Sequence, residues 1–175
     1  MGKMIFVTGG ARSGKSAFAE GLLKGRDDVA YIATARAEDD EMRARVQKHR
    51  DRRPKTWLTL ERPKGVDEAV RDAAEKCSGV LIDCITIYVS NLLLDDANTS
   101  DKEGYIEREI KALCRACREV EADVVLISNE VGSGIVPDNA LARQFRDVQG
   151  LANQALAREA DEAFLLVAGL PVKLK

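Results

Sequence analysis

Short apolar runs recur along the chain and alternate with longer segments in which apolar residues return every three or four positions. Continuous apolar runs are typical of parallel strands covered by helices, because neither face of such a strand meets water. The runs predict strands over residues 4–8, 29–34, 57–60, 80–84, 124–128 and 164–167, with an edge hairpin returning over 171–175. Strands separated by helices connect by right-handed crossovers, so the sheet should be mostly parallel.

Helical periodicity fills the intervals between these runs. It predicts helices over residues 15–24, 66–76, 86–94, 106–120 and 138–160. Asp138 is the expected cap of the last of these helices. The charged segment 38–52 also brings Met42, Val46 and His49 to one face at helical spacing.

The most specific short motif is a glycine-rich turn between the first strand and the first helix. Its residues are Gly9, Gly10, Ala11, Arg12, Ser13, Gly14, Lys15 and Ser16, which match the phosphate-loop spacing G-x-x-x-x-G-K-[ST]. The glycines let backbone N–H groups turn toward phosphate oxygens, and the next helix points its positive end at the same charge. Lys15 should reach the β and γ phosphates, Ser16 should hold Mg²⁺, and Arg12 offers a further phosphate contact.

We therefore expect a nucleoside triphosphate to bind here. The expected fold is an α/β P-loop (RecA-like) sandwich, with a mostly parallel sheet covered by helices on both faces.

Composition and charge narrow the class of protein. Hydrophobic residues make up 45% and charged residues 32% of a 175-residue chain without repeats or linkers, which predicts one domain over residues 1–175. The net charge of −2 argues against a nucleic-acid partner, and no apolar run has the length of a membrane span. The opening Met-Gly-Lys-Met-Ile lacks the plan of a signal peptide, so we expect a cytoplasmic enzyme.

Cys114 and Cys117 form a C-x-x-C pair within the predicted helix 106–120. Helical spacing places them on one face with Ile110 and Leu113, which favours a buried structural role. A redox or metal role is the alternative, but the sequence offers no second cysteine pair beside them.

Two carboxylates follow predicted strands at the expected carboxyl edge of the sheet. Asp83 ends an apolar strand and has the position of an acid that holds Mg²⁺ through water. Glu130 follows the strand 124–128 and has two alternative roles. It could orient Mg²⁺ or act as a base for an attacking hydroxyl, or it could cap the loop from Gly132 to Gly134.

The single histidine, His49, lies in a strongly basic segment. The cations around it are Lys48, Arg50, Arg52 and Arg53. They disfavour the imidazolium form by like-charge repulsion, and the neutral imidazole is the form that attacks phosphorus. The same cations could neutralise triphosphate oxygens and leaving pyrophosphate. From the residues alone, packing of His49 with Met42 and Val46 remains the alternative.

Further strings extend along nearly the whole chain. They are Tyr31-Ile32-Ala33-Thr34, His49-Arg50-Asp51, Asp83-Cys84-Ile85-Thr86, Asn129-Glu130-Val131-Gly132 and Phe145-Arg146-Asp147. Together with the phosphate loop, they resemble the bifunctional adenosylcobinamide kinase/adenosylcobinamide-phosphate guanylyltransferase family. The longest string runs Asn-Glu-Val-Gly-x-Gly-Ile-Val-Pro from Asn129.

This resemblance implies two consecutive reactions of cobalamin biosynthesis. A γ-phosphoryl group passes to the aminopropanol hydroxyl of adenosylcobinamide, and GMP from GTP then passes to adenosylcobinamide phosphate with release of pyrophosphate. The second reaction is implied to run through a GMP–histidine intermediate at His49. GTP, ATP and Mg²⁺ are the implied cofactors, and a homotrimer is the implied assembly.

The resemblance also implies nucleotide contacts beyond the phosphate loop. They are Thr34, Ala35, Arg36, Arg50, Asp51, Arg52, Arg53, Glu61 and Asp83. At the position of Asp83 the family often carries a glutamate, and a carboxylate there could accept hydrogen bonds from guanine N1–H and N2–H₂.

Two other functions stay open from the residues. One is a P-loop small-molecule kinase without guanylyltransferase activity, in which His49 only packs. The other is a nucleotide-dependent binding or switch module without transferase chemistry.

Overall fold

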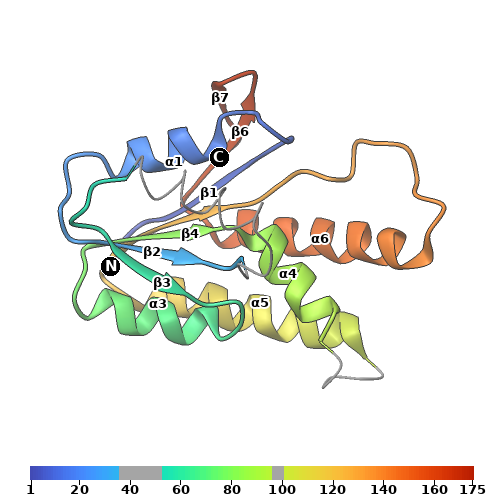
Figure 1. The fold of residues 1–175 in the computed structure, drawn as a ribbon, viewed down its shortest axis with the longest axis horizontal. Helices are drawn as coiled ribbons and strands as arrows, with labels where there is room; N and C mark the ends of the chain where they lie inside the picture. Colours follow the sequence, from blue (N-terminus) through green and yellow to red (C-terminus); the bar gives the residue numbers. More distant parts are fainter. Residues whose placement is uncertain (36–52, 96–100) are drawn as a thin grey trace.

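The computed structural model describes residues 1–35, 53–95 and 101–175. Its centre is a seven-stranded sheet in the order β3-β2-β4-β5-β1-β6-β7 (Figure 1). The strands are β1 (Met4–Gly9), β2 (Val29–Ala33), β3 (Leu58–Glu61), β4 (Gly79–Asp83), β5 (Asp123–Ile127), β6 (Glu162–Val167) and β7 (Leu170–Lys173). The helices of the described ranges are α1 (Lys15–Leu22), α3 (Val66–Ala74), α4 (Ile85–Leu93), α5 (Lys102–Glu119) and α6 (Ala140–Glu159).

The inner strands are continuous apolar runs because both of their faces are covered. All residues of β1 and β2 are buried, and so are the first four residues of β4. Strand β1 pairs in parallel with both β5 and β6, whereas β7 pairs antiparallel with β6 and exposes all four of its residues. The mostly parallel sheet and the edge hairpin are therefore confirmed.

Two buried clusters show which helices lie on which face of the sheet. One cluster joins α3, α4, α5 and α6 to residues such as Phe6 and Leu126. The other joins α1 and Trp57 to Val7 and Ile127, whose side chains alternate to the opposite face. Figure 1 shows α1 on one side of the sheet and α3 and α5 on the other. The described helices thus cover both faces, as predicted.

Helix α5 is amphipathic and buries the face that carries Cys114 and Cys117, as expected. Both thiols are free, and burial raises the pKa of Cys114 to about 11. Among the helices of residues 1–35, 53–95 and 101–175, none has the length and apolar character needed to cross a membrane.

The cap of α6 differs from the prediction. Asn139 caps the helix, because its Oδ1 accepts a hydrogen bond from the N–H of Ala142 at 3.1 Å. The prediction that Asp138 is the cap was therefore wrong. The carbonyl of Asn139 already accepts the first helical bond, from the N–H of Arg143 at 3.1 Å, so Asp138 lies one residue outside the capping position.

The carboxyl ends of the parallel strands meet at one edge of the sheet. Strand register aligns Val7 of β1 with Ile127 of β5, and Ile127 with Asp83 of β4. The segments that leave these three strands therefore begin side by side. In open α/β sheets, ligands bind at this edge.

Candidate nucleotide site

The glycine-rich turn between β1 and α1 folds around its own lysine. The Nζ of Lys15 donates to the carbonyl of Gly10 at 2.6 Å and lies 3.5 Å from Oγ of Ser13. Burial lowers the pKa of Lys15, because burial disfavours the ammonium form, while Cys84 and Asp83 nearby act in the opposite direction. Ser16 follows in the first turn of α1. This arrangement fits a phosphate-binding loop, and a phosphate contact of Lys15 stays a prediction.

The turn between β6 and β7 supports the phosphate loop. The N–H of Gly169 in that turn donates to the carbonyl of Ser13 at 2.9 Å. A Cβ atom at Gly14 would lie 3.1 Å from Cα of Gly169, and Gly14 has a φ of +96°. Both the left-handed backbone and the close approach favour glycine at position 14.

Asp83, at the end of β4, is held from the α1 side of the sheet by a buried tyrosine. The hydroxyl of Tyr31 donates to Oδ2 of Asp83 at 2.8 Å. Burial, followed by the charge of Asp83, raises the pKa of Tyr31, so the hydroxyl stays protonated and remains a donor. Asp83 therefore lies at the edge where β4 ends with one of its two carboxylate oxygens already bonded.

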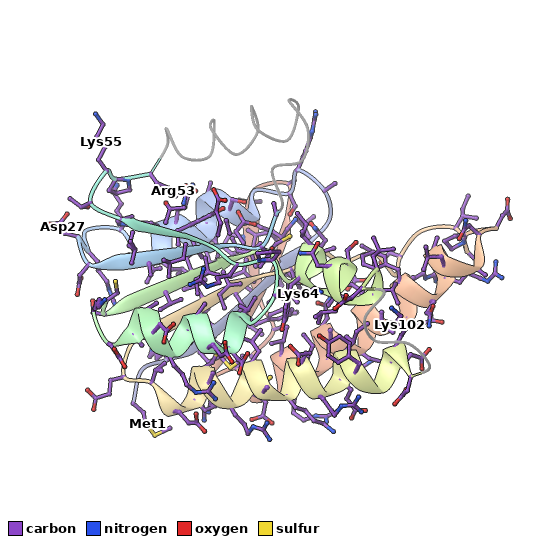
Figure 2. The ribbon with its side chains drawn as sticks, turned by 60° about the horizontal axis from the view of Figure 1, so that its bottom comes forward. Met1, Asp27, Arg53, Lys55, Lys64 and Lys102 are labelled. Carbon is purple, nitrogen blue, oxygen red and sulfur yellow. The ribbon has the colours of Figure 1, made fainter. Side chains whose placement is uncertain are left out.

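Arg53 stacks on the same tyrosine. Its Cζ lies 3.4 Å from the centre of the Tyr31 ring, a cation–π geometry, and the arginine is only 7% exposed. Figure 2 shows Arg53 on the side of the sheet that carries α1, just before the segment that leads into β3. The structure thus brings one predicted site residue, Arg53, close to another, Asp83, through Tyr31.

Thr34 is fully buried directly after β2, and it joins β2 to the end of β4. Its hydroxyl donates to the carbonyl of Cys84 at 2.7 Å and accepts from the N–H of Cys84 at 2.9 Å. Its carbonyl accepts from Nδ2 of Asn91 in α4 at 2.9 Å. The side chain of Thr34 is therefore engaged within the protein, and a nucleotide contact through it stays a prediction.

A buried polar network at the end of β5 was not anticipated from the sequence. Ser128 donates to Oδ1 of Asn153 at 2.6 Å, and Nε2 of Gln149 donates to both of these oxygens at 2.9 Å. The sequence feature that could have revealed this network is a pair of amide side chains four residues apart on an otherwise apolar helix face. Gln149 and Asn153 lie on α6 beside the buried Ala152 and Leu156.

Glu130 makes the loop contact that was one of its two predicted roles. Its Oε1 accepts from the N–H of Gly132 at 2.8 Å. An added Cβ at Gly132 would lie 2.9 Å from the same oxygen, so the carboxylate lies tightly against this turn.

The predicted site residues differ in how the structure places them. The phosphate loop, Asp83 and Arg53 lie on the α1 side or at the carboxyl edge of the sheet. Ala35 directly follows Thr34 near this edge. Glu61 ends the outermost strand, β3, at the same edge, where it pairs with Ala33 of β2 and is exposed. Arg36, His49, Arg50, Asp51 and Arg52 lie outside the described residues.

The residues at the phosphate loop fit a magnesium ion bound with a nucleotide. Mg²⁺ prefers oxygen ligands and usually takes only one or two from protein, with phosphates and waters completing its shell. The hydroxyl of Ser16 and the carboxylate of Asp83 are such ligands. Within the described ranges, no group of three or more His, Cys, Asp or Glu side chains could hold a metal by itself.

Comparison with solved structures supports the fold. An ATPase from a bacterial type III secretion system aligns with a TM-score of 0.60 at 12% identity, over 99% of this chain and 57% of the ATPase. The P4 protein of bacteriophage phi6, solved with ADP, aligns with a TM-score of 0.50 at 13% identity, over 97% of this chain and 52% of that protein. At such identities the likeness shows a shared fold alone.

Comparison with curated proteins is more specific. The bifunctional adenosylcobalamin biosynthesis protein CobU of Escherichia coli is 46% identical over 180 residues, covering 98% of this chain and 99% of the relative. The protein of the same name from Salmonella typhimurium is 47% identical, over 98% of this chain and 99% of its own. The bifunctional protein CobP of Pseudomonas aeruginosa is 41% identical over 97% of this chain and 95% of its own. Residues 5–174 match the model for cobinamide kinase / cobinamide phosphate guanyltransferase, and the chain belongs to this family.

Proposed function

We propose that this protein phosphorylates adenosylcobinamide and then transfers GMP from GTP to adenosylcobinamide phosphate, as an enzyme of cobalamin biosynthesis. The observation that carries the proposal is the phosphate loop, with Lys15 buried beneath it and Asp83 close by. Family membership supports both activities.

In the first reaction, the substrate hydroxyl attacks the γ-phosphorus of a triphosphate held in the loop. The bond from this phosphorus to the β–γ bridging oxygen breaks, the nucleoside diphosphate leaves, and the proton of the hydroxyl passes to water. Lys15 and the loop N–H groups offset the charge on the phosphate oxygens. Ser16 would hold Mg²⁺, which would neutralise further charge when bound.

In the second reaction, His49 is the proposed nucleophile. A neutral imidazole nitrogen attacks the α-phosphorus of GTP and pyrophosphate leaves, which gives GMP–histidine. An oxygen of adenosylcobinamide phosphate then attacks this phosphorus and displaces the imidazole. Arg50, Arg52 and Arg53 are proposed to offset the charge of the leaving pyrophosphate.

The guanine base is proposed to lie against Asp83 and its surroundings. Tyr31 occupies Oδ2 of this carboxylate, and the base would use the other oxygen. The remaining proposed nucleotide contacts are Thr34, Ala35, Arg36, Asp51 and Glu61. Either ATP or GTP could supply the phosphoryl group in the first reaction.

We further propose that residues 1–175 work as one P-loop domain, that the protein is cytoplasmic, and that it assembles as a homotrimer. The family resemblance supports the trimer. The net charge of −2 supports small-molecule substrates rather than a nucleic acid.

Labelled GTP tests the proposal. The protein is incubated with Mg²⁺ and GTP labelled on either the α or the γ phosphate, beside a His49→Ala variant. Acid-labile, alkali-stable protein label from the α position alone, lost in the variant, is the expected result.

Two other outcomes would point to the alternatives. Phosphorylation of adenosylcobinamide without any protein label would leave a small-molecule kinase. GTP binding with neither product would leave a nucleotide-dependent binding module.

A further inference from the structure

The chain stays extended past the end of β5, so Asn129 continues the strand. The N–H of Ser128 donates to the carbonyl of Val7 at 2.9 Å, and the N–H of Glu130 donates to the carbonyl of Gly9 at 3.0 Å. These two bonds continue the parallel ladder between β5 and β1 up to the first residue of the phosphate loop. Asn129 lies between Ser128 and Glu130, so the hydrogen bonds of these two neighbours fix its position beside the phosphate loop.

Side chains fix the other edge of Asn129. Strand β4 ends at Asp83, opposite Ile127, so it offers no backbone partner to Asn129. Instead, Oγ1 of Thr86 in α4 accepts from the N–H of Asn129 at 2.7 Å. Nδ2 of Asn153 donates to the carbonyl of Asn129 at 3.0 Å. Ser128 and Gln149 hold Asn153 in turn, through the buried network. The backbone of Asn129 is thus positioned from both sides without any use of its own side chain.

Strand alternation gives the direction of that side chain. Leu126 and Ser128 face α6, the first in the cluster shared with that helix and the second through its bond to Asn153. Ile127 faces α1, because it belongs to the cluster that contains the α1 residues. Asn129 is two residues further on and therefore shares the α1 face. Within residues 1–35, 53–95 and 101–175, its hydrogen bonds are all made by its backbone.

This position flanks the phosphate loop on the side of Asp83. Strand β5 lies between β1, which carries the loop, and β4, which ends at Asp83. A phosphate chain bound by Lys15 would extend its terminal phosphate beyond the loop, along this edge of the sheet. The negative charge that spreads over the oxygens of a transferring phosphoryl group needs donors held in place beforehand, and a carboxamide NH₂ is such a donor.

We propose that the carboxamide of Asn129 donates a hydrogen bond to the terminal phosphoryl group of the triphosphate bound by the phosphate loop. Asn129 is then a catalytic residue of the phosphoryl transfer, and Thr86 and Asn153 are positioning residues. The inference rests on the proposed function only in that the loop binds a nucleoside triphosphate.

Nucleotide binding tests this contact without the second substrate. GDP and the β,γ-methylene analogue of GTP are titrated with Mg²⁺ into the wild type and an Asn129→Ala variant. We expect the variant to lose about tenfold in affinity for the analogue, as for a hydrogen bond to a charged group. Its affinity for GDP, which lacks the terminal phosphate, should stay within about twofold.

Two further variants distinguish the loss of the phosphate contact from damage to the fold. Asn129→Asp keeps the shape but sets a carboxylate against phosphate, so it should lose more affinity for the analogue than Asn129→Ala. Asn139→Ala makes the same substitution at the cap of α6, and it should bind both nucleotides like the wild type. If Asn129→Ala weakens GDP and the analogue equally, or weakens neither, the proposal is overturned.

Turnover gives the second readout. With adenosylcobinamide as acceptor and saturating nucleotide, Asn129→Ala should lower kcat about 100-fold, the usual effect of removing one such donor, with little change in the KM for adenosylcobinamide. A wild-type kcat in Asn129→Ala would overturn the proposal. Absence of transfer in the wild type would contradict the proposed function instead, and the nucleotide titrations would still decide the role of Asn129.

Discussion

Replacing Thr34 by valine tests whether the contact between β2 and β4 is a main support of the site. Valine matches threonine in shape, so the change removes two hydrogen bonds to Cys84 and leaves no cavity. The carbonyl of Cys84 keeps a second donor, the N–H of Tyr88 at 3.1 Å, whereas the buried N–H of Cys84 loses its partner. An unsatisfied buried donor costs about 1–3 kcal/mol, and the bond lost at the carbonyl adds a smaller cost.

We therefore expect Thr34→Val to lower the free energy of unfolding by about 2 kcal/mol, and Tm by about 4–8 °C for a chain of this length. Urea unfolding followed by the fluorescence of Trp57 measures this, because that residue is the single tryptophan and is 7% exposed. Thr34→Ser is the matched control, since it keeps the hydroxyl and loses one methyl, at a cost of about 1 kcal/mol. A Thr34→Val variant as stable as Thr34→Ser would refute this reasoning.

Three further variants extend the predictions. Burial lowers the pKa of Lys15 below its value in the unfolded chain, so the charge of Lys15 destabilises the nucleotide-free protein at neutral pH. Thermal unfolding should therefore show a higher Tm for Lys15→Met without nucleotide and no stabilisation of this variant by GTP. The gain in Tm should disappear as the pH rises toward the pKa of an ordinary lysine. Hydrogen bonds from the N–H of Met4 and from Arg118 hold the pKa of Asp161 low. Asp161→Ala should therefore lower the free energy of unfolding by about 1 kcal/mol at neutral pH, after solvent screening. Urea unfolding should show this difference shrinking below about pH 4. Tyr31→Phe removes the hydrogen bond that holds the carboxylate of Asp83, and nucleotide titration should show the preference for GTP over ATP falling about fivefold. An unchanged preference would show that Asp83 does not contact the base.

Much of the fold could be predicted from local pattern. The apolar runs identified strands such as β1 and β5 because strands buried on both faces have few polar residues. The phosphate loop could be predicted because its chemistry depends on residues that are adjacent in the chain. The cap of α6 was misplaced by one residue, since Asp138 and Asn139 are both good capping residues and only the backbone decides between them.

The supports of the site could not be predicted in the same way. Tyr31 and Asp83 are 52 residues apart in sequence, and Thr34 and Cys84 are 50 apart. Each pair joins a side chain to a group on a neighbouring strand, so it depends on strand order and register, which periodicity does not specify. Asn129, for which we propose a phosphate contact, was missed for a similar reason, because Thr86 and Asn153, which position it, are distant in sequence.

The contact between Gly169 and the phosphate loop has a consequence for synthesis of the protein. The loop is made among the first residues, yet its strand β1 pairs with β5 and β6, and its Ser13 carbonyl is bonded to the turn before β7. A nascent chain on the ribosome therefore contains the whole phosphate loop early, but it lacks β5, β6 and Gly169 until nearly all of the sequence described here has emerged. We therefore expect a nucleotide bound by the phosphate loop to stabilise nascent chains that end before Gly169 less than it stabilises the full chain.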